Sequence, residues 1–199
     1  ERITFLVTER YPQGIALFAV HGGGKLWLDD CALMCKNDKA LDPRFRRFNS
    51  CGVGRGVTVE KGSSVVISGC VVKDADGAAV MVDPDSDRVV VERSILTCCG
   101  RGEDEQCASG EFGAIEIQDG YQGKYPEREG PDNPKWPNHR PKVKILVSDS
   151  QIEGNLGPAL SYRPFGDQIR QMFPVTDKND PTQKRARQLA QVFTVERCQ

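Results

Sequence analysis

The cysteines are the first residues in this sequence whose chemistry could define a site. Two groups lie close enough along the chain to suggest a zinc ion, Cys31 with Cys35 and Cys51, and Cys98 with Cys99 and Cys107. Neither group has the paired C-x-x-C spacing of structural zinc sites, so we expect buried thiols and no metal. The eight cysteines also lack the compact spacing of a disulfide framework. This favours an intracellular, reducing compartment, either the cytoplasm or the interior of an organelle.

Three aspartates offer a second candidate site. Asp83, Asp85 and Asp87 alternate along the chain as oxygen ligands do in a calcium loop, but the segment lacks the terminal glutamate of an EF-hand loop. Calcium at these residues is the one cofactor that the sequence suggests, and the expectation favours none.

Proton-transfer catalysis would need clustered acids, or a histidine beside a carboxylate. Glu116 is the single acid expected on the outward face of the shorter strands described below, and neither His21 nor His139 has an obvious acidic partner. We therefore assign no catalytic residue, and the sequence favours a protein that is not an enzyme.

Three arginines could bind an anionic group. Arg44, Arg46 and Arg47 lie together around two phenylalanines, but 27 basic against 28 acidic side chains make solvated surface arginines the better interpretation. The formal net charge of -1 favours neither a nucleic acid nor an anionic membrane as partner. The apolar runs are also far shorter than the roughly 20 residues of a membrane-spanning helix, so we expect no membrane insertion.

A short repeated pattern must position these residues. Segments 25–34, 64–73, 88–97 and 144–153 alternate polar and apolar residues in one register and pass through a cysteine or serine, with partial copies at 3–8 and 193–198. A shorter apolar strand precedes each later copy, at about 17–20, 56–59, 79–82, 114–117 and 159–162. The shortest full period, 23 residues from Val59 to Val82, is typical of a parallel β-solenoid.

These rungs and the glycine turns between them resemble the right-handed parallel β-helix family of pectin-lyase-like proteins, which includes repeat regions of F-box proteins and carbohydrate-active enzymes. The resemblance implies an all-β fold, a right-handed parallel β-helix of about five coils, in a single domain over residues 1–199. We expect loop insertions at about 36–54, 99–111, 119–141 and 163–191, and a short helix at 180–192. Because both ends match part of a repeat, we expect the chain to be a piece of a longer solenoid.

Alternation within the rungs assigns the direction of each side chain. The two inward columns are Ile3, Leu26, Val65, Val89, Ile145 and Phe193, and Phe5, Leu28, Ile67, Val91, Val147 and Val195. A column of small groups at a bend contains Thr8, Cys31, Cys70, Ser94, Ser150 and Cys198. The outward row between the inward columns is Thr4, Trp27, Val66, Val90, Leu146 and Thr194.

The outward row carries the functional prediction. Its four central members would form an apolar stripe, which a loop of the same chain or a partner protein should cover. These candidate protein-binding residues are Trp27, Val66, Val90 and Leu146. On the shorter strands, outward residues such as Thr58 are expected to tolerate a charge because they would face solvent.

The sequence therefore favours a non-catalytic β-helix that acts as a scaffold or protein-docking module within a larger assembly. Its partner would be another protein or further coils of the same chain. The alternative is a carbohydrate-binding or polysaccharide-cleaving β-helix, a lyase or glycoside hydrolase, whose active residues lie largely outside this piece.

Overall fold

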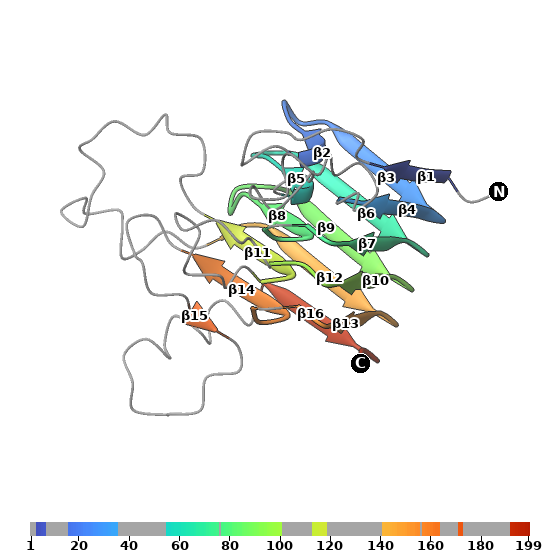
Figure 1. Ribbon diagram of the computed structural model, residues 1–199. Helices are drawn as coiled ribbons and strands as arrows, with labels where there is room; N and C mark the ends of the chain where they lie inside the picture. Colours follow the sequence, from blue (N-terminus) through green and yellow to red (C-terminus); the bar gives the residue numbers. More distant parts are fainter. Residues whose placement is uncertain are drawn as a thin grey trace, which may run out of the picture.

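The computed structural model describes residues 3–6, 16–35, 55–75, 77–100, 113–118, 141–155, 157–163, 171–172 and 192–199. Within these residues the structure is all β, and its strands form three sheets, here named A, B and C (Figure 1). Sheet A contains β1 (Ile3–Leu6), β4 (Cys31–Met34), β7 (Val71–Lys73), β10 (Ile95–Thr97) and β13 (Gln151–Glu153). Sheet B contains β2 (Ala16–Val20), β5 (Arg55–Val59), β8 (Val80–Val82), β11 (Ile115–Gln118), β14 (Leu160–Arg163) and β15 (Gln171–Met172). Sheet C contains β3 (Lys25–Asp29), β6 (Ser64–Ser68), β9 (Arg88–Glu92), β12 (Lys144–Ser148) and β16 (Phe193–Glu196).

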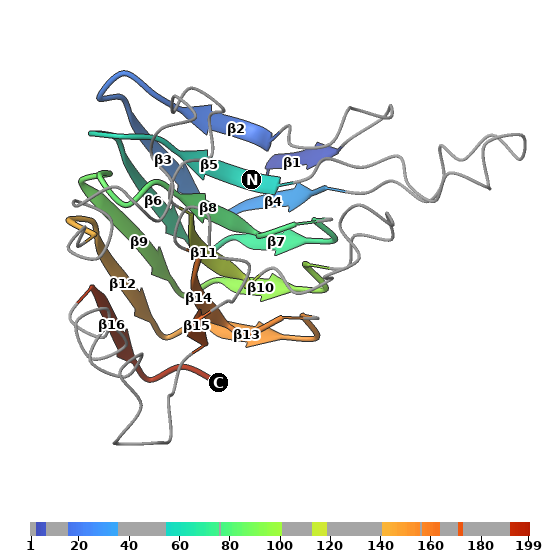
Figure 2. The ribbon, with the colours of Figure 1, turned by 90° about the vertical axis from the view of Figure 1, so that its left-hand side faces the viewer.

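The chain visits the three sheets in rotation. From a strand of sheet B it passes to sheet C, then to sheet A, and then back to sheet B. Neighbouring strands are parallel throughout, except that β15 pairs antiparallel with β14. Figure 2 shows the result as separate stacks of strands, in which each strand lies beside its counterpart from the preceding circuit.

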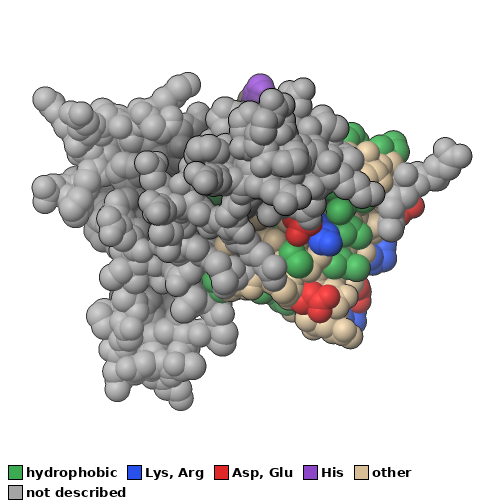
Figure 3. All heavy atoms as spheres, in the orientation of Figure 1, with side chains coloured by type: hydrophobic (Ala, Val, Ile, Leu, Met, Phe, Trp, Pro, Cys, Tyr) green, Lys and Arg blue, Asp and Glu red, His purple; other side chains and the backbone are tan. Residues whose placement is uncertain are grey.

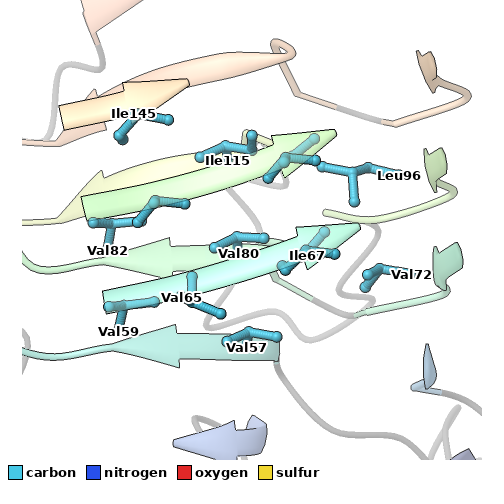
Figure 4. Close-up of a cluster of buried hydrophobic side chains, with 14 of the residues drawn as sticks. Val57, Val59, Val65, Ile67, Val72, Val80, Val82, Leu96, Ile115 and Ile145 are labelled. Atoms are coloured by element: carbon cyan, nitrogen blue, oxygen red, sulfur yellow. The ribbon is translucent and has the colours of Figure 1, made fainter. Parts of the chain in front are cut away.

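Inward side chains of the three sheets form one apolar core (Figure 4). Val57, Val80 and Ile115 align across sheet B, and Ile67 aligns with Val91 across sheet C. All five are 0% exposed. Adjacent strands are about 4.8 Å apart, so each β-branched side chain packs against its counterparts above and below. The strand register of sheet C confirms the alignment of the two predicted columns, from Leu26 to Phe193 and from Leu28 to Val195. Val195, at the last strand of the sheet, is 52% exposed, so its predicted burial in the core is wrong.

The prediction for the first strand is wrong. Strand β1 pairs with β4 in sheet A, where Ile3 lies opposite Cys31 and Phe5 lies opposite Leu33. Neither residue extends the columns of sheet C, and Thr4 does not belong to the outward row of that sheet. The alternating pattern of this short segment fits a strand of either sheet, so the pattern alone could not place it in the circuit.

A repeated turn follows each strand of sheet C, and after the first four of these strands it leads to a strand of sheet A. Its central residue has a left-handed backbone in five successive copies, with φ between 48° and 64°, at Asp30, Gly69, Arg93, Asp149 and Arg197. Aspartate and glycine are common in this conformation, whereas arginine is unusual there and adopts it because the surrounding ladder fixes the turn.

The residue after each turn builds the predicted bend column. The Ser94 hydroxyl donates a hydrogen bond to the Glu92 carbonyl at 2.8 Å and accepts one from the Cys70 amide at 3.0 Å. In the next circuit the Ser150 hydroxyl accepts from the Ser94 amide at 3.1 Å. The small side chains therefore satisfy backbone groups that the turn removes from the sheets, and the column is confirmed for its described members.

Several predicted features lie outside the described residues. They are the helix at 180–192 apart from Val192, Thr8, and most of the four predicted insertions. Among the described residues the structure contains no helix.

Candidate docking face

Three rows of outward side chains cross the strands of sheet C. The middle row is the predicted stripe, because the register pairs Trp27 with Val66. It then pairs Val66 with Val90 and Val90 with Leu146. Thr194 of β16 continues the row beyond Leu146. The structure thus brings all four predicted residues together in one line.

Exposure along the stripe is uneven. The Trp27 residue is 72% exposed, Val66 and Leu146 are half-buried, and Val90 is 5% exposed. None of the four belongs to the apolar core between the sheets, although their sequence neighbours, such as Val91, do. Trp27 is therefore the exposed anchor of an otherwise partly covered row.

A basic row runs along one side of the stripe. It consists of the first residue of four successive strands of sheet C, which are Lys25, Ser64, Arg88 and Lys144. The three cations are exposed. In the described part of the chain none of them lies within ion-pairing distance of a carboxylate. Beside the apolar residues the row therefore presents three positive charges that have no ion-pair partner among the described residues.

The opposite side of the stripe is lined by acids and serines, which are Asp29, Ser68, Glu92, Ser148 and Glu196. Arginines of the adjoining turn neutralise part of this row. Arg93 lies 3.2 Å from the Glu92 carboxylate, and Arg197 lies 3.6 Å from that of Glu196. Arg197 also donates two hydrogen bonds to Asp149, at 2.6 and 2.7 Å, and so lowers the pKa of the Asp149 carboxyl below its ordinary value.

The described cysteines fit structural roles better than chemical ones. None of the six forms a disulfide. Burial raises the pKa of the Cys70 thiol, and it raises that of Cys99 to about 12, because desolvation disfavours the thiolate. The thiolate is the nucleophile and the metal ligand, so these two thiols are poor at both tasks. Cys51 and Cys107, which complete the two candidate zinc groups, lie outside the described residues.

Asp83, Asp85 and Asp87 lie in the turn before β9. The Asp83 carboxylate accepts a hydrogen bond from the Asp85 amide at 2.8 Å. The Asp85 carboxylate lies 3.9 Å from the Lys61 ammonium and 3.5 Å from that of Lys142. Two ammonium groups would compete with a calcium ion for this carboxylate. Among the described residues there is no group of three or more His, Cys, Asp or Glu side chains that could hold a metal.

The outer face of sheet B is exposed at Ala19 but buried from Thr58 onward, contrary to the prediction for Thr58. Thr58 is 7% exposed, and Met81, Glu116 and Ser161, which align with it, are at most 1% exposed. The Glu116 carboxylate accepts hydrogen bonds from the Ser161 hydroxyl and the Gly113 amide, each at 3.1 Å. Strand alternation assigns a side chain to a face but does not say what covers that face. Glu116, the single acid of this face, is fully buried and hydrogen-bonded to Ser161 of the neighbouring strand β14.

The remaining candidates contribute no site in the described structure. His21 is exposed in the turn after β2, whereas His139, Arg44, Arg46 and Arg47 lie outside the described residues. On the described surface that Figure 3 shows, hydrophobic, acidic and basic side chains are interspersed. No helix in the described segments has the length and apolar character needed to cross a membrane.

Sequence reasoning missed the basic row. Its signal was present, because each rung begins with a polar position before the first inward residue. Three of the four full rungs have a cation there, at Lys25, Arg88 and Lys144, and the fourth has Ser64. Comparing the sign of the charge at equivalent positions of the repeat would have found the row.

Comparisons with protein-family models, with curated proteins and with solved structures found no match.

Proposed function

We propose that the chain is a stretch of right-handed parallel β-helix that serves as a non-catalytic scaffold, and that it docks another protein on the outer face of sheet C within a larger assembly. Rotation of the chain through three sheets of parallel strands supports the β-helix. Connections between parallel strands of one sheet are right-handed in nearly all proteins, which supports the proposed hand.

One observation carries the docking proposal. Trp27 is 72% exposed at the end of a register-aligned apolar row, outside the core. A tryptophan in this position leaves a large apolar surface in water, and tryptophan and arginine are the residues most enriched among the energetically dominant contacts of protein interfaces. Trp27 and Arg88 belong to adjacent rows of the same face.

The architecture suits a rigid platform. Each circuit contacts its neighbours through three sheets. Hydrogen bonds of the bend column connect each turn to the next. Side chains of sheet C are therefore held at a spacing of about 4.8 Å along the stack. An active site on sheet B of this piece is not supported for the polysaccharide-cleaving alternative, because the Glu116 carboxylate there is fully buried. That alternative then depends on residues outside this piece.

The native size of the protein tests this proposal. A tagged chain, expressed in the cells from which it comes, should migrate in a complex much larger than its own 22.0 kDa. The double variant Trp27→Ser with Leu146→Ser should migrate as the free chain, because it removes the exposed end and the far end of the stripe while leaving the core intact.

Lys73→Glu provides the matched control, since Lys73 lies on β7 of sheet A and its side chain is 41% exposed. This variant should remain in the complex. The docking proposal is wrong if the wild-type chain runs alone, or if the stripe variant stays in the complex. Release of unsaturated products or new reducing ends from polygalacturonate, abolished by Glu116→Gln, would establish the catalytic alternative instead.

A further inference from the structure

The distribution of charge on the outer face of sheet C restricts the kind of partner that fits it. On one side of the stripe, Lys25, Arg88 and Lys144 are exposed and have no ion-pair partner in the described part of the chain. On the other side, arginines of the turn already pair with Glu92 and Glu196. Among the described residues of the face, three cations on one side and the Asp29 carboxylate on the other side therefore remain without an ion-pair partner, and the balance is positive.

The dimensions of the face match a helix better than an extended segment. From Trp27 to Leu146 the row crosses three strand spacings, or about 14 Å. Apolar residues at positions i, i+4, i+7 and i+11 of an α-helix span about 16 Å and repeat about every 5.4 Å. Side chains on one side of an extended strand repeat about every 6.8 Å, which matches the rung spacing of about 4.8 Å less closely.

We propose, on the basis of the proposed docking function, that this face binds an acidic amphipathic helix of a partner protein. The helix lies across the strands of sheet C and along the stack. Its apolar side chains contact Trp27, Val66 and Leu146. Its carboxylates lie beside Lys25, Arg88 and Lys144, and its opposite flank is poor in acids because Asp29 is exposed on that side.

A peptide selection tests the inference. A library of helical peptides of about 15 residues, with apolar positions fixed at i, i+4, i+7 and i+11 and all other positions random, is selected on the full chain. Binders to the Trp27→Ser variant are removed. We expect the surviving peptides to be enriched in Asp and Glu on one side of the apolar stripe and not on the other.

The affinity of one selected peptide is then measured by isothermal titration calorimetry. Arg88→Glu should weaken binding about fivefold or more, because it replaces an attraction of the size of an exposed ion pair by a repulsion. Raising the salt concentration should weaken binding of the wild-type chain as well. Lys73→Glu, on sheet A, should leave the affinity unchanged, and circular dichroism checks that both variants are folded.

Each other outcome overturns the inference. Two outcomes would contradict the acidic helix while still supporting the docking face. The selected peptides could need Trp27 but show no acidic bias, or they could bind Arg88→Glu as tightly as the wild type. A selection that yields no peptide dependent on Trp27 would reject a helical occupant, while the native-size experiment decides independently whether the face docks anything. If a short single-stranded DNA oligonucleotide binds more tightly than the selected peptide, with the same dependence on Arg88, the face would be assigned to nucleic acid instead.

Discussion

The division of sheet C into an inner and an outer face predicts that Ile67, on the inner face, contributes more to stability than the larger Trp27 on the outer face. Ile67 is 0% exposed and lies between Leu28 and Val91 of the neighbouring strands. Both neighbours are fixed in the ladder, so they cannot move far into the space that Ile67→Ala leaves. We expect a loss of about 4 kcal/mol, in the upper part of the range for isoleucine-to-alanine changes.

Trp27→Ala should be less damaging, although it deletes many more atoms. With 72% of Trp27 exposed, about 70 Å² of a total near 250 Å² is buried. At about 25 cal/mol per Å² this burial contributes at most about 1.7 kcal/mol, and less if the unfolded chain already covers part of the ring.

Urea denaturation followed by circular dichroism measures both changes in the free energy of unfolding. The Ile67→Ala loss should exceed the Trp27→Ala loss by at least about twofold. Equal losses, or a greater loss for Trp27→Ala, would refute the assignment of the two faces.

Three further predictions follow from buried and turn residues. In the folded protein Cys99 should resist iodoacetamide while Cys198 reacts, which peptide mass spectrometry can show. Because the pKa of Cys99 rises from an ordinary 9.0 to about 12 on folding, the contribution of this thiol to stability should be complete below pH 9 and be lost between pH 9 and 12. Cys99→Ser should reduce this loss of stability at high pH. Gly56→Ala should destabilise the fold by about 1 to 3 kcal/mol in urea denaturation, because a Cβ at this position would lie 2.6 Å from the Ala79 carbonyl oxygen. Unchanged stability would mean that β5 and the chain at Ala79 are farther apart than the structure shows. Arg197 lowers the folded-state pKa of Asp149, so this pair stabilises the protein above the ordinary pKa of aspartate and loses its effect as the pH falls. Arg197→Gln should therefore make the free energy of unfolding less sensitive to acid. An unchanged dependence of stability on acid pH would contradict the pairing.

The sequence predicted most of the strand arrangement because the same physical constraint recurs in every circuit. A side chain inside a stack of parallel strands must be apolar, which placed Val65, Val89 and Ile145 in one column correctly. The placement of Ile3 failed because an isolated alternating segment fits more than one sheet.

The candidate face was only partly predictable. Alternation identified the row from Trp27 to Leu146, but periodicity contains no information about what covers a face, so neither the burial of Val90 nor that of Thr58 could be foreseen. The pairing of Arg197 with Asp149 depends on two turns that lie 48 residues apart in sequence and meet only after a full circuit.

Site-specific photo-crosslinking tests the docking face most directly. Benzoylphenylalanine, which forms covalent bonds with groups beside it when irradiated, replaces Trp27 in one protein and Lys73, on sheet A, in another. In the cells from which the chain comes, we expect irradiation to convert the Trp27 variant into a distinct heavier adduct with another protein, and to leave the Lys73 variant unchanged. Adducts of the Trp27 variant only within its own chain, or equal adducts from both positions, would contradict a docking role for this face.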